Sequence, residues 1–232
     1  AQAHMNVIRA RAVLVQARTA IINAIRGLCK SFGEPLKSCG AESVKPGLGE
    51  NLTPDLKSAL MPLFEEVESL SKRIKEYEQQ IEAIAREYHL ETALLKQVYG
   101  VGSLVALTYV LTIEDPERFR HSRDVGCYLG LRPGRRNSGQ SQPQLHISKE
   151  GNTYLRFLLV QSAHHLLGRF GADCDLRRWG LRLAERGGKN AKRRAVVAVA
   201  RKLAVLLHKL WISGEAYQPL RNSSSMVAAS AA

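Results

Sequence analysis

Apolar residues recur every three or four positions along most of this chain, which is the spacing of amphipathic helices. Over residues 3–32 the apolar positions also repeat every seven residues, and the pattern ends before Gly33 and Pro35, which stop a helix. The repeating residues are Val7, Leu14, Ile21 and Leu28, with Ile25 and Phe32 alongside. The pattern predicts one long helix over residues 3–32 and a loop over residues 33–52.

A second long helix is predicted to begin after Thr53, a suitable N-cap, with Pro54 at the first helical position. Its apolar residues alternate in steps of three and four over four heptads, the repeat of a coiled coil. They are Leu60, Leu63, Val67, Leu70, Ile74, Tyr77, Ile81, Ile84 and Tyr88. Its remaining faces are net acidic, so it is expected to pair with a helix and not with DNA. The partner is either the residue 3–32 helix, which is favoured because only the loop must turn back, or another subunit.

The pattern changes after Leu94, where two apolar segments, residues 95–98 and 104–113, flank Gly100 and Gly102. This arrangement resembles a helix-hairpin-helix motif, in which glycines bring backbone N–H groups close to a DNA phosphate. An ordinary glycine turn between two helices fits the pattern equally well. Both glycines are therefore candidate nucleic-acid-binding residues.

Further helices are predicted within residues 114–133 and over residues 152–170 and 190–213, whereas residues 134–146 are polar and are assigned to no element. The expected fold is mainly α. Long antiparallel coiled-coil helices are followed by a helical DNA-binding domain with a helix-hairpin-helix-like motif. The expected parts are a coiled-coil hairpin over residues 1–94, a C-terminal domain over residues 95–215 and a disordered tail over residues 216–232.

The charge of the chain indicates a polyanionic partner. The net charge is +13, and the positive excess is concentrated in the C-terminal half. Residues 118–156 hold eight Lys or Arg against two acids, and residues 176–202 hold ten against one. The second cluster includes three candidate nucleic-acid contacts, Lys192, Arg193 and Arg194. A solvated helix face is the alternative, although such faces usually mix charges of both signs.

One serine lies in a glycine-containing loop with cationic residues on both sides. A hydroxyl attacks a phosphodiester when it is positioned and the developing negative charge is stabilised, and guanidinium groups suit that second task. Ser138 is therefore the candidate catalytic nucleophile. The alternative is a loop whose serines cap turns and whose cations hold phosphates without chemistry. The candidate phosphate-binding or motif-stabilising residues are Arg132, Arg135, Arg136, Lys149, Asn152 and Arg156.

These residues resemble the C-terminal domain of the IS110 and IS1111 insertion-sequence transposases, over about residues 1–212. The runs that carry the resemblance are GLRP at 130–133, NSG at 137–139, ISKEGN at 147–152 and LR at 155–156. The resemblance implies a recombinase that acts on DNA, is guided by an RNA encoded by the element, and forms a covalent link to DNA through a serine at the position of Ser138. Ser148, in the ISK run, is a weaker candidate.

The resemblance also implies an N-terminal RuvC-like nuclease domain with four metal-binding carboxylates, to which nothing in this chain corresponds. We therefore expect no metal ligands or cofactor in this chain, and Mg²⁺ only with that missing domain. The chain begins inside a predicted helix, so it is expected to be a fragment that is inactive or weakly active alone. The four cysteines form no CxxC pair and suit a reducing cytosol. No uncharged stretch reaches the length of a membrane span, so a bacterial cytoplasmic, nucleoid-associated protein without a membrane partner is expected.

Two other hypotheses remain open. The chain could be a non-catalytic module that grips DNA or guide RNA through its basic helices. It could also serve assembly, with the coiled coil joining copies into a homo-oligomer.

Overall fold

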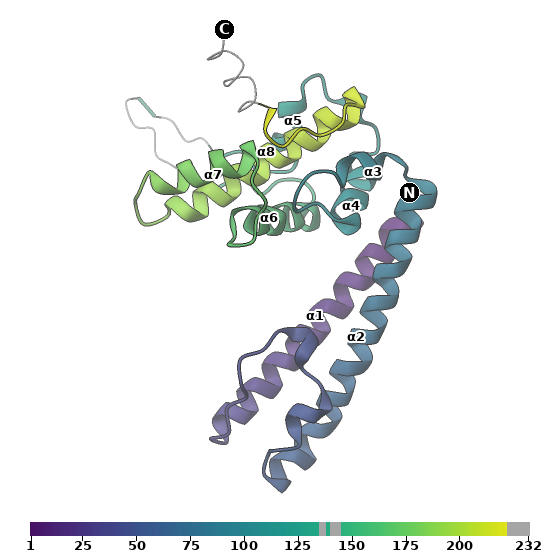
Figure 1. Ribbon diagram of the computed structural model, residues 1–232, viewed down its shortest axis with the longest axis vertical. Helices are drawn as coiled ribbons and strands as arrows, with labels where there is room; N and C mark the ends of the chain where they lie inside the picture. Colours follow the sequence, from purple (N-terminus) through teal and green to yellow (C-terminus); the bar gives the residue numbers. More distant parts are fainter. Residues whose placement is uncertain (135–137, 140–144, 222–232) are drawn as a thin grey trace. The chain divides into compact units, whose positions relative to one another are not determined.

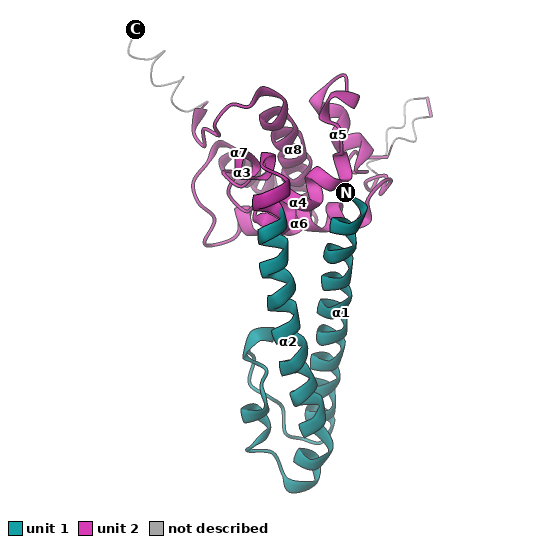
Figure 2. Ribbon diagram, turned by 90° about the vertical axis from the view of Figure 1, so that its right-hand side faces the viewer, with its two compact units in different colours: residues 1–84 teal, residues 85–232 magenta. Residues whose placement is uncertain are grey.

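The computed structural model describes residues 1–134, 138–139 and 145–221, and within these ranges it contains helices, loops and an isolated β-bridge between Pro133 and Ile147 (Figure 1). The mainly α fold class is thereby confirmed. The chain divides into two compact units, Ala1–Ile84 and Ala85–Ala232 (Figure 2). The α-helices are α1 Gln2–Ser31, α2 Pro54–Tyr88, α3 Glu91–Leu95, α4 Ser103–Ile113, α5 Ser122–Tyr128, α6 Thr153–Leu167, α7 Asp175–Glu185 and α8 Ala191–Ser213. Short 3₁₀ helices are η1 Ala41–Ser43, η2 Pro46–Gly49 and η3 Pro116–Arg118.

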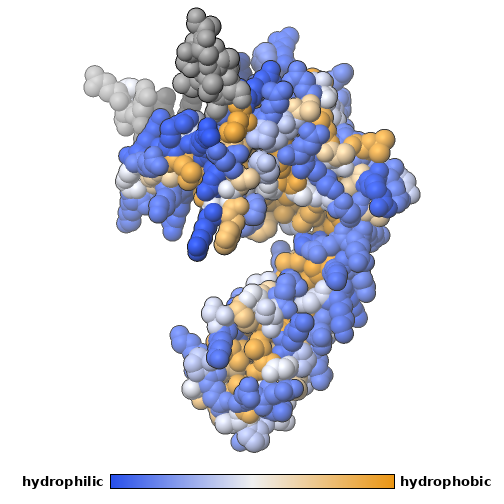
Figure 3. Space-filling model, viewed as in Figure 1, coloured by the Kyte–Doolittle hydropathy of each residue, from blue (hydrophilic) through white to orange (hydrophobic). Residues whose placement is uncertain are grey.

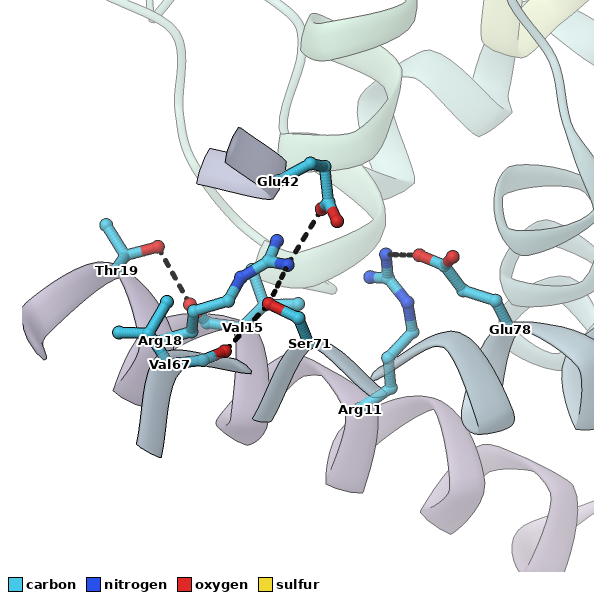
Figure 4. Close-up of polar contacts among 8 residues, drawn as sticks. All are labelled: Arg11, Val15, Arg18, Thr19, Glu42, Val67, Ser71 and Glu78. Atoms are coloured by element: carbon cyan, nitrogen blue, oxygen red, sulfur yellow. Dashed lines mark hydrogen bonds and ion pairs between the residues drawn. The ribbon is translucent and has the colours of Figure 1, made fainter. Parts of the chain in front are cut away.

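In the first unit, α1 and α2 pair antiparallel within the chain. Arg11 forms an ion pair with Glu78, and Arg18 donates a 3.1 Å hydrogen bond to the hydroxyl of Ser71 (Figure 4). As the residue numbers rise along α1 they fall along α2, which defines the antiparallel direction. The buried core of this pair consists of Ile22, Ile25, Cys29, Val44, Leu56, Leu60, Phe64 and Val67.

The loop between α1 and α2 is held against α1 by two arginines. Arg18 also donates a 2.7 Å hydrogen bond to the carboxylate of Glu42, and Arg26 donates one of 2.7 Å to the carbonyl of Cys39 (Figure 4 shows the first). Val44, from the same loop, is buried in the core of the unit. The predicted loop is therefore an ordered part of the first unit.

The apolar stripe that α1 buries is shifted by one position along the sequence from the predicted stripe. Ile8, Ile22 and Cys29 are buried, whereas Leu28 of the predicted stripe is 48% exposed. The reason is that apolar residues occupy two adjacent positions of the heptad, 7 and 8, 14 and 15, 21 and 22, 28 and 29. A helix with so wide an apolar face can turn either position toward its partner, and the packing on α2 selects the second.

By length and composition, α1 is the one helix among the described residues that could cross a membrane, a test that core helices of soluble proteins also pass. It carries Arg9, Arg11, Arg18 and Arg26. In the structure it packs on α2 within the first unit.

The second unit is built around α8. This helix packs against α3, α5, α6, α7 and η3, and its residues Val199, Leu203 and Leu207 are fully buried. Two polar contacts fix its neighbours: the Tyr109 hydroxyl of α4 donates a 2.8 Å hydrogen bond to the Ala204 carbonyl, and the buried His208 ring lies 2.9 Å from the Pro116 carbonyl. The apolar run predicted for the last helix therefore forms the centre of this unit.

The segment after α8 folds back on the unit. The Tyr217 amide donates a 2.9 Å hydrogen bond to the side chain of Gln97, and the Asp175 amide donates one of 2.7 Å to the Pro219 carbonyl. Residues 216–221 of the predicted disordered tail take part in this contact, and residues 222–232 lie outside the described residues.

Candidate nucleic-acid site

The loop that carries Ser138 rises from a short antiparallel base. The Gly134 amide donates to the His146 carbonyl at 2.8 Å, and the Ser148 amide donates to the Arg132 carbonyl at 2.9 Å. Pro133 and Ile147 form the isolated β-bridge between these two bonds. Backbone hydrogen bonds thus close both ends of the loop, whatever side chains the loop carries.

Ser138 itself is exposed, as a nucleophile that meets a large substrate must be. Ser148 differs, because its hydroxyl oxygen is buried and finds no hydrogen-bond partner among the described residues. Of these two hydroxyls, the structure therefore exposes only the one that the sequence favours. Arg135 and Arg136, which were predicted to flank the nucleophile, lie outside the described residues.

Arg156 joins the base of the loop to the helices on both sides. Its side chain is buried. Its guanidinium donates hydrogen bonds to the Leu129 carbonyl at 3.0 Å, the Glu150 carbonyl at 2.6 Å and the Thr153 hydroxyl at 3.2 Å. Since these three hydrogen bonds all go to oxygens of the chain itself, the geometry favours the motif-stabilising role over the phosphate-binding role for Arg156.

Two glycines let the segments on either side of the loop touch through their backbones. Gly130 and Gly151 have φ angles of 64° and 72°, a region that other residues seldom adopt. A Cβ on Gly130 would overlap the backbone of Glu150, and one on Gly151 would overlap the carbonyl of Tyr128. The end of α5 and the start of α6 are therefore in direct backbone contact.

Asn152 begins α6 as its N-cap. Its side-chain oxygen accepts a 2.9 Å hydrogen bond from the Leu155 amide, the usual capping contact. Its amide nitrogen lies 3.4 Å from the Thr112 hydroxyl. The predicted phosphate ligand is thus engaged on both sides of its amide, and what it does in the structure is to fix the start of α6.

The remaining predicted cations of this region are exposed. Arg132 and Lys149 lie on the two sides of the loop base, and Lys149 has a φ of 60°, an uncommon value for a residue with a side chain. Lys192 and Arg193 are exposed on the first turn of α8, and Arg194 follows them. These positions give cations to two separate elements of the second unit, where the phosphate-binding role stays a prediction.

The predicted helix-hairpin-helix glycines have different surroundings. Gly100 has a φ of 81°, and a Cβ on it would lie 3.1 Å from the Ser162 carbonyl of α6. It therefore serves packing against α6. Gly102 is exposed at the N-cap of α4 with open space around it. A helix, a turn and a helix are present, and DNA contact by this turn stays a prediction.

Replacing Arg156 by lysine is expected to lower the free energy of unfolding of the second unit by about 2 kcal/mol, because a single ammonium cannot reach the three oxygens that the guanidinium bridges. Urea unfolding followed by tryptophan fluorescence measures this, since both tryptophans, Trp179 and Trp211, lie in that unit. The matched change Arg123→Lys, on an exposed position of α5, should cost less than about 0.5 kcal/mol. Equal costs for the two variants would show that the buried bridge is unimportant.

Within the described ranges, no group of three or more His, Cys, Asp or Glu residues is placed to hold a metal ion. The described residues therefore do not fit a Mg²⁺ site.

Comparison with known proteins agrees with this picture of the second unit. The model of the family described as Transposase IS116/IS110/IS902 matches residues 92–179, a range that contains the glycine turn, the Ser138 loop and its supporting residues. The transposase of insertion sequence element IS1111A from Coxiella burnetii is 34% identical over 213 residues, which are 88% of this chain and 57% of that protein. A probable family 20 transposase from Pseudomonas aeruginosa is 33% identical over 226 residues, which are 94% of this chain and 66% of that protein.

All of these matches fall in one class, the transposases of bacterial insertion sequences. The chain carries the domain of the IS116/IS110/IS902 transposase family over residues 92–179 and is similar to transposases over most of its length, as its resemblance predicted. It spans between half and two thirds of the length of these two relatives.

Proposed function

We propose that this chain is the DNA-joining part of a transposase, in which the Ser138 hydroxyl attacks a DNA phosphodiester and forms a covalent protein–DNA link. The observation that carries the proposal is the exposure of Ser138 on a loop whose two ends are closed by backbone hydrogen bonds and by buried Arg156. Similarity to transposases supports DNA as the substrate. The buried hydroxyl of Ser148 supports the choice between the two serines.

The proposed reaction is a transesterification. A bond forms between the Ser138 oxygen and phosphorus, while the bond between phosphorus and one bridging oxygen of the DNA strand breaks. The serine loses one proton and the departing strand takes up one to leave as a hydroxyl. One ester replaces another, so the step needs no nucleotide hydrolysis, and attack by a strand hydroxyl on the serine ester reverses it.

The cations of the loop supply charge stabilisation in this proposal. Arg132 and Lys149 lie exposed on the two sides of the loop base, and in this proposal they contact non-bridging phosphate oxygens of the bound DNA. Their contribution rises as negative charge builds in the transition state, which is the requirement for catalysis. Arg135 and Arg136 are proposed for the same role from their places in the sequence.

The complete recombinase is proposed to need more than this chain. The resemblance implies a further N-terminal nuclease domain with Mg²⁺ and a guide RNA. Assembly of copies through the long helices is proposed from their heptad repeat. Covalent joining by this chain is therefore proposed to depend on that further domain.

The experiment that tests the proposal traps the link and locates it. The full-length protein, with its upstream domain, would be incubated with a DNA substrate nicked near the cleavage point, so that a released end cannot rejoin. Trypsin cuts after Arg136 and Lys149, and the resulting peptide, residues 137–149, contains Ser138, Ser141 and Ser148. Fragmentation in the mass spectrometer should place the attached nucleotide on Ser138. Salt-sensitive DNA binding without any adduct would instead favour the non-catalytic binding module.

A further inference from the structure

The α7–α8 pair brings together two side chains that are far apart in the sequence. The helices approach closely at Gly180, where an added Cβ would lie 2.5 Å from a methyl of Val199 on α8 and 2.7 Å from Leu167. Beside this point, the Lys202 ammonium of α8 lies 4.0 Å from the ring centroid of Trp179 on α7. The face of an indole attracts a cation, so the ring holds the ammonium at a defined position.

Arg182 is the second cation of this helix pair. Burial lowers the pKa of Lys202, and the positive charge of Arg182 on α7 lowers it further. Arg182 follows Trp179 by three residues on α7, so both side chains project from the same side of that helix, where Trp179 contacts Lys202. The helix pair therefore presents two like charges on one side, an arrangement that a negative charge stabilises. Among the described residues, the interaction found for this pair is the contact of Lys202 with the Trp179 ring, and no acidic group acts on Lys202.

The neighbouring arginines of α7 are already engaged. Arg177 donates hydrogen bonds to the carbonyls of Leu166 and Gly168. Arg178 forms an ion pair with Asp173 at 2.6 Å, and this hydrogen bond lowers the pKa of the Asp173 carboxyl. Of the three arginines of α7, these roles leave Arg182 to receive an external anion together with Lys202.

We propose that Arg182 and Lys202 form a binding site for a backbone phosphate of duplex DNA, with Trp179 as the support that positions the ammonium. The proposal rests on the proposed function for its DNA partner. A guanidinium beside an ammonium combines a bidentate phosphate ligand with a point charge. The surroundings match, because residues 176–202 carry ten Lys or Arg and a single acid, Glu185. On the face that Figure 3 shows, the surface over α7 and the adjoining part of α8 is mostly hydrophilic.

Arg182 and Lys202 both lie after residue 179, where the match to the family model ends. They are on α7 and α8, and not on the Ser138 loop. Phosphate contacts of this kind position a duplex and do not read its sequence. Arg182 and Lys202 are thus positioning residues that would hold DNA at a distance from the reacting phosphate.

The test is the salt dependence of binding to a short fluorescein-labelled DNA duplex, measured by fluorescence anisotropy over a series of NaCl concentrations. Each phosphate contact contributes about 0.9 to the slope of log affinity against log salt. Because the two side chains share one phosphate, the double variant Arg182→Gln/Lys202→Gln should lower the magnitude of the slope by about 0.9 and weaken binding roughly eightfold near 0.1 M salt. The variant Lys202→Arg keeps the positive charge, so its slope of log affinity against log salt should stay close to that of the wild type.

The control removes the same charge elsewhere. Lys72→Gln/Arg73→Gln changes two exposed cations of α2, on the net acidic helix, and should leave the slope unchanged. Equal slopes for the wild type and the Arg182/Lys202 variant would overturn the proposal, as would a slope loss seen with a structured RNA but not with the duplex. Ser138→Ala should keep the wild-type slope, so failure of the catalytic proposal and failure of this one give different results.

Discussion

Replacement of Ser138 by alanine in the full-length protein is expected to abolish the covalent protein–DNA link, lowering its yield by roughly 10³-fold or more, as loss of an essential nucleophile does. Alanine keeps the backbone of the loop, whose ends are closed by main-chain bonds. Non-covalent affinity for DNA should therefore change little. Denaturing gel electrophoresis of the labelled nicked substrate measures the link, and anisotropy measures the binding.

Ser148→Ala is the matched control for this experiment. It removes a buried hydroxyl that has no hydrogen-bond partner among the described residues, a loss that costs little stability. The link should form at the wild-type level. A link that persists in Ser138→Ala, or that disappears in a stably folded Ser148→Ala protein, would assign the chemistry to another residue.

The largest effect on stability is expected for Gly151→Ala. The change combines a φ of 72°, which costs an alanine about 1 kcal/mol, with a Cβ that overlaps the Tyr128 carbonyl. The backbone contact between α5 and α6 must then separate, and the hydrogen bonds of Arg156 to both segments separate with it. We expect a loss of about 4 kcal/mol in the free energy of unfolding of the second unit, measured by urea unfolding with tryptophan fluorescence.

Gly214→Ala separates the two causes of that loss. Gly214 ends α8 with a φ of 65° and has no atom within 4 Å of an added Cβ. Gly214→Ala should therefore lower the free energy of unfolding only through the positive φ angle, by about 1 kcal/mol. If the two glycine variants unfold at the same urea concentration, the contact at the loop base contributes nothing to stability.

The helices were predictable because most of them expose one face to solvent and bury the other. The predicted ranges for α1, α6 and α8 agree with the structure within a few residues. The structure adds α7, which the sequence analysis did not assign: its apolar residues Leu176, Trp179 and Leu183 fit a helix, but they stand among arginines in a short segment. The side of α1 that packs was not predictable, because two neighbouring heptad positions are equally apolar.

The sequence predicted which residues make up the candidate site but not how their side chains are placed. The sequence located a serine among cations, but it could not separate a cation that meets DNA from one that holds the fold. Arg132 and Arg156 lie in the same motif, yet one is exposed and the other is buried against three oxygens. The Trp179–Lys202 contact joins two helices across 23 positions, and no local pattern marks it.

The main-chain closure of the Ser138 loop also bears on how such a protein can diversify. Because amides and carbonyls hold the two ends, insertions, deletions and exchanged side chains between them leave the frame intact. Loops from related elements that keep a serine at the position of Ser138 could therefore be grafted between Gly134 and His146 without redesigning the helices beneath.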